Sequence, residues 1–136
     1  MEFFEPYSHA LAAMSGYALL MFVLTYLSVF GRGEDMRTAS GAVKRDYANP
    51  MYRRGRAHAN AVETAGPFLL ATCAGILTGA APFWVNALAS TFLVARILMA
   101  LVHIGTTNQP ARSAFWGISI VCVLALAVLG LLAAFT

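Results

Sequence analysis

The sequence predicts an all-α fold, an integral membrane bundle of four helices. Of the 136 residues, 60% are apolar and 11% are charged, and the mean hydropathy is +0.70. Three long runs contain no Asp, Glu, Lys or Arg, namely Ser8 to Gly31, Thr64 to Ala95 and Ser113 to Thr136. Because about 20 apolar helical residues cross a hydrocarbon core of about 30 Å, each run is long enough for one span or more.

The first helix is predicted over residues 7–30, and a basic loop over residues 31–55. A cleavable signal peptide is the alternative for the N-terminus, but Glu2 and Glu5 stand where a signal peptide carries basic residues. The loop is rich in small and turn-forming residues, so we expect at most a short helix in it. It is long enough to act as a lid, which Tyr47, Tyr52 and Asn49-Pro50 are expected to shape.

The middle of the chain is predicted to form two helices, 56–79 and 84–106. The apolar stretch that begins at Thr64 is too long for one span, and Pro82 cannot continue a helix. Trp84 beside that proline is suited to a membrane interface. A fourth helix is predicted over residues 112–135, so residues 1–136 form a single transmembrane domain.

The basic residues predict the orientation of the bundle. Seven of the nine lie between the first two helices or at that boundary, and Lys and Arg favour the cytoplasmic side of a membrane. This loop is therefore expected in the cytoplasm, with both termini on the opposite side. The same residues would attract anionic lipid headgroups, whereas nucleic-acid binding is not expected without a separate basic domain. The seven are Arg32, Arg37, Lys44, Arg45, Arg53, Arg54 and Arg56.

Three polar residues share one face at the start of the second helix. Arg56, Asn60 and Glu63 are spaced by four and then three residues, which places their side chains one above another. Such a stripe is costly against lipid, so the face is expected to look into a protein interior or a polar cavity.

Glu63 and Arg96 are predicted to pair across a helical hairpin. If the hairpin turns near Ala81, their depths differ by only about 5 Å at about 1.5 Å per residue. A buried pair by itself would serve only to fix the fold. Further cations and polar groups at the same end favour a binding site for an anionic ligand with several polar groups, such as glutathione. These residues are Arg56, His58, Asn60, His103 and Arg112.

Two segments resemble the MAPEG family, the membrane-associated proteins of eicosanoid and glutathione metabolism. RGRAHANAVETAGPF, residues 54–68, is similar to the family's second-helix pattern, which runs Arg-Ala-His-x-Asn-x-x-Glu and then Pro-Phe. VARILMALVHIGTTNQPARSAFW, residues 94–116, resembles its third-helix arginine, short loop and Pro-x-Arg-Ser start of the fourth helix. The second segment is most similar to the branch of the microsomal prostaglandin E synthases and glutathione transferases. The two segments occur in the family's order, and the four-helix prediction covers the whole chain.

The resemblance implies a homotrimer with glutathione, as co-substrate, bound in clefts between subunits that open to the cytoplasm. Arg112 would lie at the thiol, with Ser113 as the adjacent catalytic candidate. A fixed cation favours the thiolate, which is the nucleophile, and the start of a helix adds backbone N–H groups and a positive dipole end. The residues implied to bind glutathione or complete its site are Arg56, Asn60, Glu63, Arg96 and His103.

The chain departs from the family pattern at three positions. Ala59 replaces an arginine of several members, and His103 and Trp116 stand where tyrosines are usual. His103 can still hydrogen-bond a ligand, or it can be an interfacial residue near a helix end. These departures favour conjugation or peroxide reduction over prostaglandin isomerisation.

The sequence therefore predicts a membrane-bound, glutathione transferase-like detoxifying enzyme. Its second substrate would be a lipophilic electrophile or a lipid hydroperoxide that partitions from the bilayer. One alternative is a non-catalytic lipid-binding or scaffold member of the same family, and another is a small transporter that uses Glu63 as its coupling carboxylate. The sequence shows no His/Cys cluster at metal-ligand spacing, no Gly-rich phosphate loop and no hydrolase triad.

Overall fold

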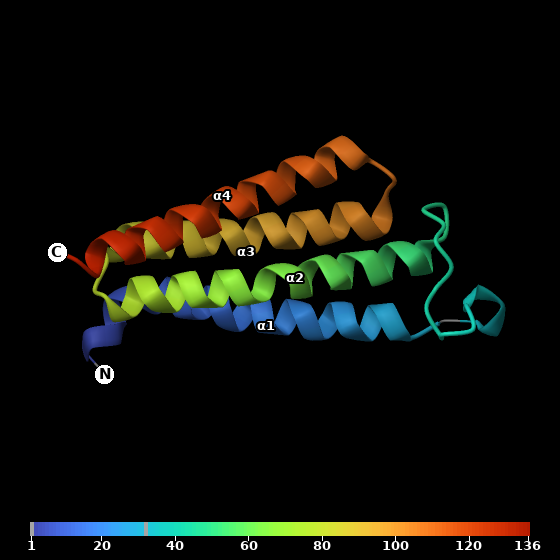
Figure 1. Ribbon diagram of the computed structural model, residues 1–136, viewed down its shortest axis with the longest axis horizontal. Coiled ribbons are helices and arrows are strands. Elements are labelled where there is room, and N and C mark those ends of the chain that lie inside the picture. The colour runs from blue at the N-terminus through green and yellow to red at the C-terminus, as the bar shows by residue number, and fades with distance from the viewer. Residues whose placement is uncertain (1, 32) are drawn as a thin grey trace.

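The structure, a computed structural model that describes residues 2–31 and 33–136, is built from four long helices (Figure 1). All four are long and apolar enough to cross a membrane, which confirms the predicted all-helical membrane fold. Short 3-10 turns, Glu2–Tyr7 (η1) and Glu34–Met36 (η2), precede the first helix and interrupt the loop. Arg32 of the predicted basic loop lies outside the described residues. The helices are Ser8–Val29 (α1), Pro50–Leu77 (α2), Pro82–Gly105 (α3) and Gln109–Ala133 (α4).

The starts of α2 and α4 differ from the prediction. Helix α2 begins six residues before the predicted position 56, because Asn49 is an N-cap whose side chain accepts a hydrogen bond from the Met51 amide at 2.8 Å. Pro50 then occupies the first helical position, where its missing N–H costs nothing. Asn108 caps α4 in the same way, accepting from the Ala111 amide at 3.1 Å. The break between α2 and α3 at Pro82 was predicted correctly.

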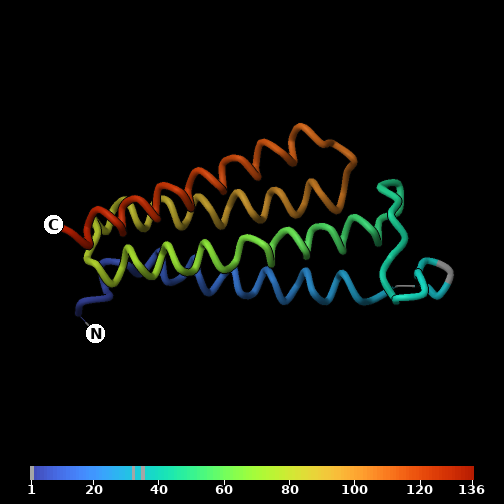
Figure 2. Tube along the Cα trace, viewed as in Figure 1, coloured from blue at the N-terminus to red at the C-terminus, as the bar shows by residue number. Residues whose placement is uncertain are grey.

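The four helices run alternately up and down the bundle (Figures 1 and 2). Both termini and the short α2–α3 turn lie at one end, which we call the termini end. The loop of residues 30–49 and the α3–α4 connection lie at the other, which we call the loop end. Helices α1 and α4 pack on opposite sides of the α2–α3 pair.

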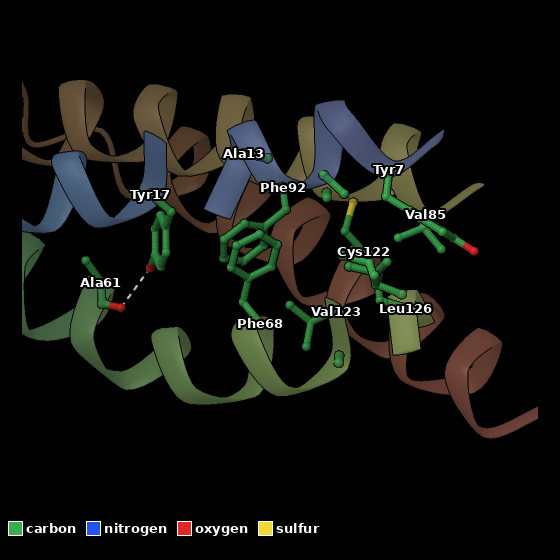
Figure 3. Close-up of a cluster of buried hydrophobic side chains, with 14 of the residues drawn as sticks. Tyr7, Ala13, Tyr17, Ala61, Phe68, Val85, Phe92, Cys122, Val123 and Leu126 are labelled. Carbon is green, nitrogen blue, oxygen red and sulfur yellow. Dashed lines mark hydrogen bonds between the residues drawn. The ribbon is translucent and has the colours of Figure 1, made fainter. Parts of the chain in front are cut away.

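Tyr17 of α1 organises the core and fixes the rotation of α2. Its ring is fully buried and lies edge-on to the stacked rings of Phe68 and Phe92 (Figure 3). Its hydroxyl donates to the Ala61 carbonyl at 2.7 Å and lies 2.8 Å from the Thr64 hydroxyl oxygen. A buried hydroxyl without a partner is costly, so these bonds hold the Ala61 and Thr64 side of α2 toward the interior.

The termini end is tied together by polar side chains. The buried Tyr7 hydroxyl donates to the Ala80 carbonyl at 2.6 Å, which joins the N-terminal turn to the α2–α3 turn. Asn86 of α3 accepts from the Ala10 amide at 2.9 Å and donates to the Pro6 carbonyl at 2.6 Å. The start of α1 is therefore fixed to the start of α3.

Small residues bring α4 close to α2 near the same end. A Cβ atom placed on Gly130 would lie 3.0 Å from the Gly75 amide nitrogen and 3.2 Å from the Ala74 carbonyl carbon. Any larger residue at position 130 would therefore push the two backbones apart by a few tenths of an ångström.

Candidate functional site

The stripe on α2 faces outward from the single chain. Arg56 and Glu63 are exposed and Asn60 is half-buried, whereas Ala57, Ala61 and Thr64, each one position later, are buried. Successive residues of a helix are rotated by about 100° from each other. The rotation of α2 that buries Ala57, Ala61 and Thr64 therefore turns the predicted stripe outward. The expectation that this stripe looks into the interior is not met within one subunit.

Arg96 is buried and bonds to Asn60. Only 3% of Arg96 is exposed, and its Nη2 donates to both the backbone carbonyl and the side-chain Oδ1 of Asn60, each at 2.8 Å. Its Nη1 contacts the Met99 sulfur at 3.2 Å. These bonds cross from α3 to α2 at the level of the predicted site.

The predicted direct ion pair between Glu63 and Arg96 is not formed within the single chain, although the Glu63 charge still acts on Arg96 at longer range. Within the described residues, no Glu63 oxygen lies within 4.0 Å of the Arg96 guanidinium nitrogens. The reason is again the rotation of α2, because Thr64 bonds to Tyr17 on the inner side and Glu63 is turned outward. Arg96 does reach α2 within one turn of Glu63, as the predicted depths require. Depth along a helix does not determine the direction in which a side chain points.

The bond to Arg96 fixes the orientation of the Asn60 amide. A guanidinium only donates, so the Asn60 oxygen must be the atom that faces it. The Nδ2 group makes none of the hydrogen bonds found in residues 2–31 and 33–136. Asn60 therefore offers N–H donors, which suit a carboxylate or a peptide carbonyl.

A second polar cluster joins three elements at the loop end. Arg112, half-buried in the first turn of α4, donates from Nη1 to the Tyr47 hydroxyl at 2.8 Å. Its guanidinium carbon lies 5.2 Å from the centre of the Tyr47 ring. The same hydroxyl lies 3.3 Å from Nε2 of His103, which is buried at the end of α3.

Arg53 holds the backbone beside this cluster. Its Nη1 donates to the carbonyls of Tyr47 and Ala48 at 2.8 and 2.9 Å, and its Nε donates to the Ile104 carbonyl at 3.2 Å. One side chain of α2 thus fixes the end of the loop to the end of α3.

A small cavity lies between the two clusters. Its volume is about 10 Å³, about the space that a single water molecule needs, and Arg96 and His103 both line it. Arg96 Nε and His103 Nδ1 are buried without a hydrogen-bond partner in the described chain. The two clusters therefore approach each other inside the subunit along α3.

The structure brings together only some of the predicted site residues. Asn60 meets Arg96, and His103 meets Arg112 through Tyr47. Arg56, Glu63 and Ser113 are exposed and take part in none of the described side-chain hydrogen bonds.

Sequence reasoning missed the contacts of Tyr47 and the role of Arg53. Tyr47 was assigned to the lid in general, and Arg53 only to the charge of the loop. No helical spacing marks either residue, because their partners lie on other elements. If Asn49-Pro50 is interpreted as the start of a helix, the sequence places Arg53 in the first turn of α2 and so predicts that it lies near the loop.

The start of α4 can stabilise an anion. Arg112 supplies a cation there, and the positive end of the helix dipole adds to it. Asn60 and Arg56 supply further donors on α2, and the exposed Glu63 can accept from an ammonium or amide group. The donor set therefore suits a polar, anionic small molecule.

The family model for MAPEG matches residues 10–132, a range that takes in nearly all of the four helices. No curated protein matches the chain.

Proposed function

The chain belongs to the MAPEG family, and we therefore propose that it is a membrane-bound glutathione transferase-like enzyme. It would activate the glutathione thiol for conjugation to a lipophilic electrophile or for reduction of a lipid hydroperoxide. The family includes glutathione transferases and related members. The Val94 to Trp116 segment supports a place in the prostaglandin E synthase and glutathione transferase branch, with conjugation or peroxide reduction as the chemistry.

The observation that carries this proposal is the position of Arg112. The side chain is half-buried in the first turn of α4, at the positive end of the helix dipole, and its guanidinium is held by Tyr47. A thiol is mostly protonated at neutral pH, and a fixed cation at the positive end of a helix favours the thiolate, which is the nucleophile. Ser113, the next residue, is exposed and provides a hydroxyl for the same thiol.

Arg56, Asn60 and Glu63 are proposed to hold the glutathione peptide between subunits. Glu63 is exposed about 20 Å along α2 from its start, at about 1.5 Å per residue, which is well inside a helix that spans a membrane. An ionised side chain facing lipid at that depth is costly. A homotrimer would cover this face with a second subunit and turn an exposed stripe into an enclosed cleft.

Arg96 is proposed to act through Asn60. Because only 3% of Arg96 is exposed, its contribution to binding is to orient the Asn60 amide so that Nδ2 points away from it. His103 is likewise buried, and its link to Arg112 through Tyr47 supports a role at the thiol end of the site.

Orientation in the membrane completes the proposal. The basic residues of the loop favour the cytoplasm for the loop end, so glutathione would enter from that side. A lipophilic substrate would enter from the bilayer, between the helices.

The proposal is tested with Arg112→Ala in detergent-purified protein. Turnover of a model electrophile at saturating glutathione should fall by about 100-fold or more if the cation stabilises the reacting thiolate, the range seen for lost electrostatic groups. Glutathione affinity, measured by calorimetry, should change much less, and Arg112→Lys should recover part of the rate. The pH profile of thiolate absorbance should move to higher pH in Arg112→Ala.

Arg45→Ala is the matched control, because Arg45 is an exposed cation of the loop before α2, at the same end of the bundle as Arg112. Its rate and pH profile should equal those of the wild type. If Arg112→Ala also kept the wild-type rate and profile, the activating cation would lie elsewhere. Glutathione binding without turnover in the wild type would instead indicate a non-catalytic member of the family.

A further inference from the structure

We propose that Tyr47 is a positioning residue for Arg112, so that the loop before α2 controls thiol activation at the start of α4. The inference rests on the proposed function and adds a residue to that site. It is based on the juxtaposition of a loop tyrosine, a buried histidine of α3 and the half-buried arginine of α4.

The hydroxyl of Tyr47 fixes one edge of the guanidinium. Arg112 Nη1 donates to it at 2.8 Å, and the guanidinium carbon lies 5.2 Å from the centre of the Tyr47 ring. A guanidinium has five N–H donors, so this bond leaves four for a thiolate or other ligand. Tyr47 thus restrains Arg112 without using up its capacity to bind an anion.

The hydroxyl is itself held from the other side. While it accepts from Arg112, its own hydrogen is available to His103 Nε2, which lies 3.3 Å away and is buried. Such a chain of three groups gives the hydroxyl a defined direction, because both of its neighbours belong to membrane helices. The position of Arg112 therefore depends on a side chain from outside those helices.

The backbone of Tyr47 is held independently of its hydroxyl. Arg53 donates to the carbonyls of Tyr47 and Ala48 and to that of Ile104. Loss of the hydroxyl alone should therefore leave the loop in place. This allows a clean test, since Tyr47→Phe keeps the ring under the guanidinium and removes only the hydrogen bonds.

The test compares Tyr47→Phe with Tyr52→Phe. The Tyr52 ring lies edge-on to that of Tyr47 at 5.4 Å, and its hydroxyl makes no hydrogen bond in the described part of the chain. Tyr47→Phe should lower kcat by at least about tenfold, as small misplacements of catalytic groups do, with KM for glutathione nearly unchanged. The pH profile of thiolate formation should move to higher pH. Tyr52→Phe should behave as the wild type in all three measurements.

A double variant separates positioning from an independent effect. If Tyr47 acts through Arg112, Tyr47→Phe should have little further effect on kcat in an Arg112→Ala background. An equal fold-loss in both backgrounds would overturn the inference, as would a wild-type kcat and pH profile for Tyr47→Phe. Tyr47→Leu, which also removes the ring, should lower kcat further. Melting temperatures should show that every variant stays folded at the temperature of the kinetic assay.

The two proposals fail in different ways. If Arg112→Ala loses activity while Tyr47→Phe keeps it, thiol activation by Arg112 stands and the role of Tyr47 is refuted. If the wild-type protein neither binds nor turns over glutathione, the proposed function fails, and the inference fails with it.

Discussion

Replacement of Asn60 with Leu should destabilise the protein, because it removes one hydrogen-bond acceptor of the buried Arg96 guanidinium. Arg96 is 3% exposed, and Asn60 supplies both oxygen acceptors of its Nη2, at 2.8 Å each. Leu has the same branched shape as Asn but no acceptor. The variant would leave the Arg96 guanidinium with the backbone carbonyl of residue 60, the sulfur of Met99 and the nearby Tyr17 hydroxyl.

The size of the effect can be worked out from this partial loss of partners. Removing every partner of a buried charge costs about 3–5 kcal/mol. One hydrogen bond to a charged group contributes about 1.5–3 kcal/mol. Because the backbone bond survives, we expect the lower range, about 1.5–3 kcal/mol of unfolding free energy. Asn60→Asp should raise the free energy of unfolding or leave it unchanged, since it places a carboxylate beside the Arg96 guanidinium.

The assay is reversible unfolding in mild detergent, followed by helical circular dichroism. Asn60→Leu combined with Arg96→Met should recover most of the lost stability, because no buried cation then remains unpaired. Glu63→Gln should lower the stability of the isolated subunit much less than Asn60→Leu does, because the Glu63 carboxylate acts on Arg96 only at longer range. The assignment is refuted if Glu63→Gln destabilises the subunit and Asn60→Leu does not, because Glu63 would then be the partner of Arg96.

Three further predictions concern packing and assembly. Tyr7→Phe should lower the unfolding free energy by about 1–3 kcal/mol, because it leaves the Ala80 carbonyl unsatisfied, and denaturant titration measures this. Gly130→Leu should cost about 1–3 kcal/mol or more by forcing side-chain atoms against the α2 backbone near Gly75, and Gly117→Leu, in open space on the same helix, is its control. Mass analysis in mild detergent should give a trimer; monomers or dimers alone, with folding intact, would contradict the inter-subunit site.

The sequence was sufficient for the fold. Charge-free runs and Pro82 predicted four membrane helices, and the structure has them. The start of α2 was misplaced because Asn-Pro is found both in turns and at helix N-caps, and only the conformation of the next few residues distinguishes the two. A cap that lies before a run of arginines gives no hydrophobic periodicity to identify it.

The candidate site was predictable only within one helix. Spacing placed Arg56, Asn60 and Glu63 on one face, but the rotation of that face is set by Tyr17, 44 residues from Ala61. The contact between Tyr47 and Arg112 spans 65 residues. Neither contact can be predicted from a local sequence pattern, because each depends on how elements distant in the sequence pack together.

The close contact at Gly130 makes the tilt of α4 sensitive to the residue at this position, far from the first turn of the helix. From Gly130 to Arg112 the helix rises about 27 Å, so a rotation of about 5° at the contact would move Arg112 by about 2 Å. A displacement of about 1 Å at a reacting group can change a rate by about 100-fold. A larger residue at position 130 is therefore expected to slow turnover as well as to lower stability, although it lies at the opposite end of the bundle from the thiol.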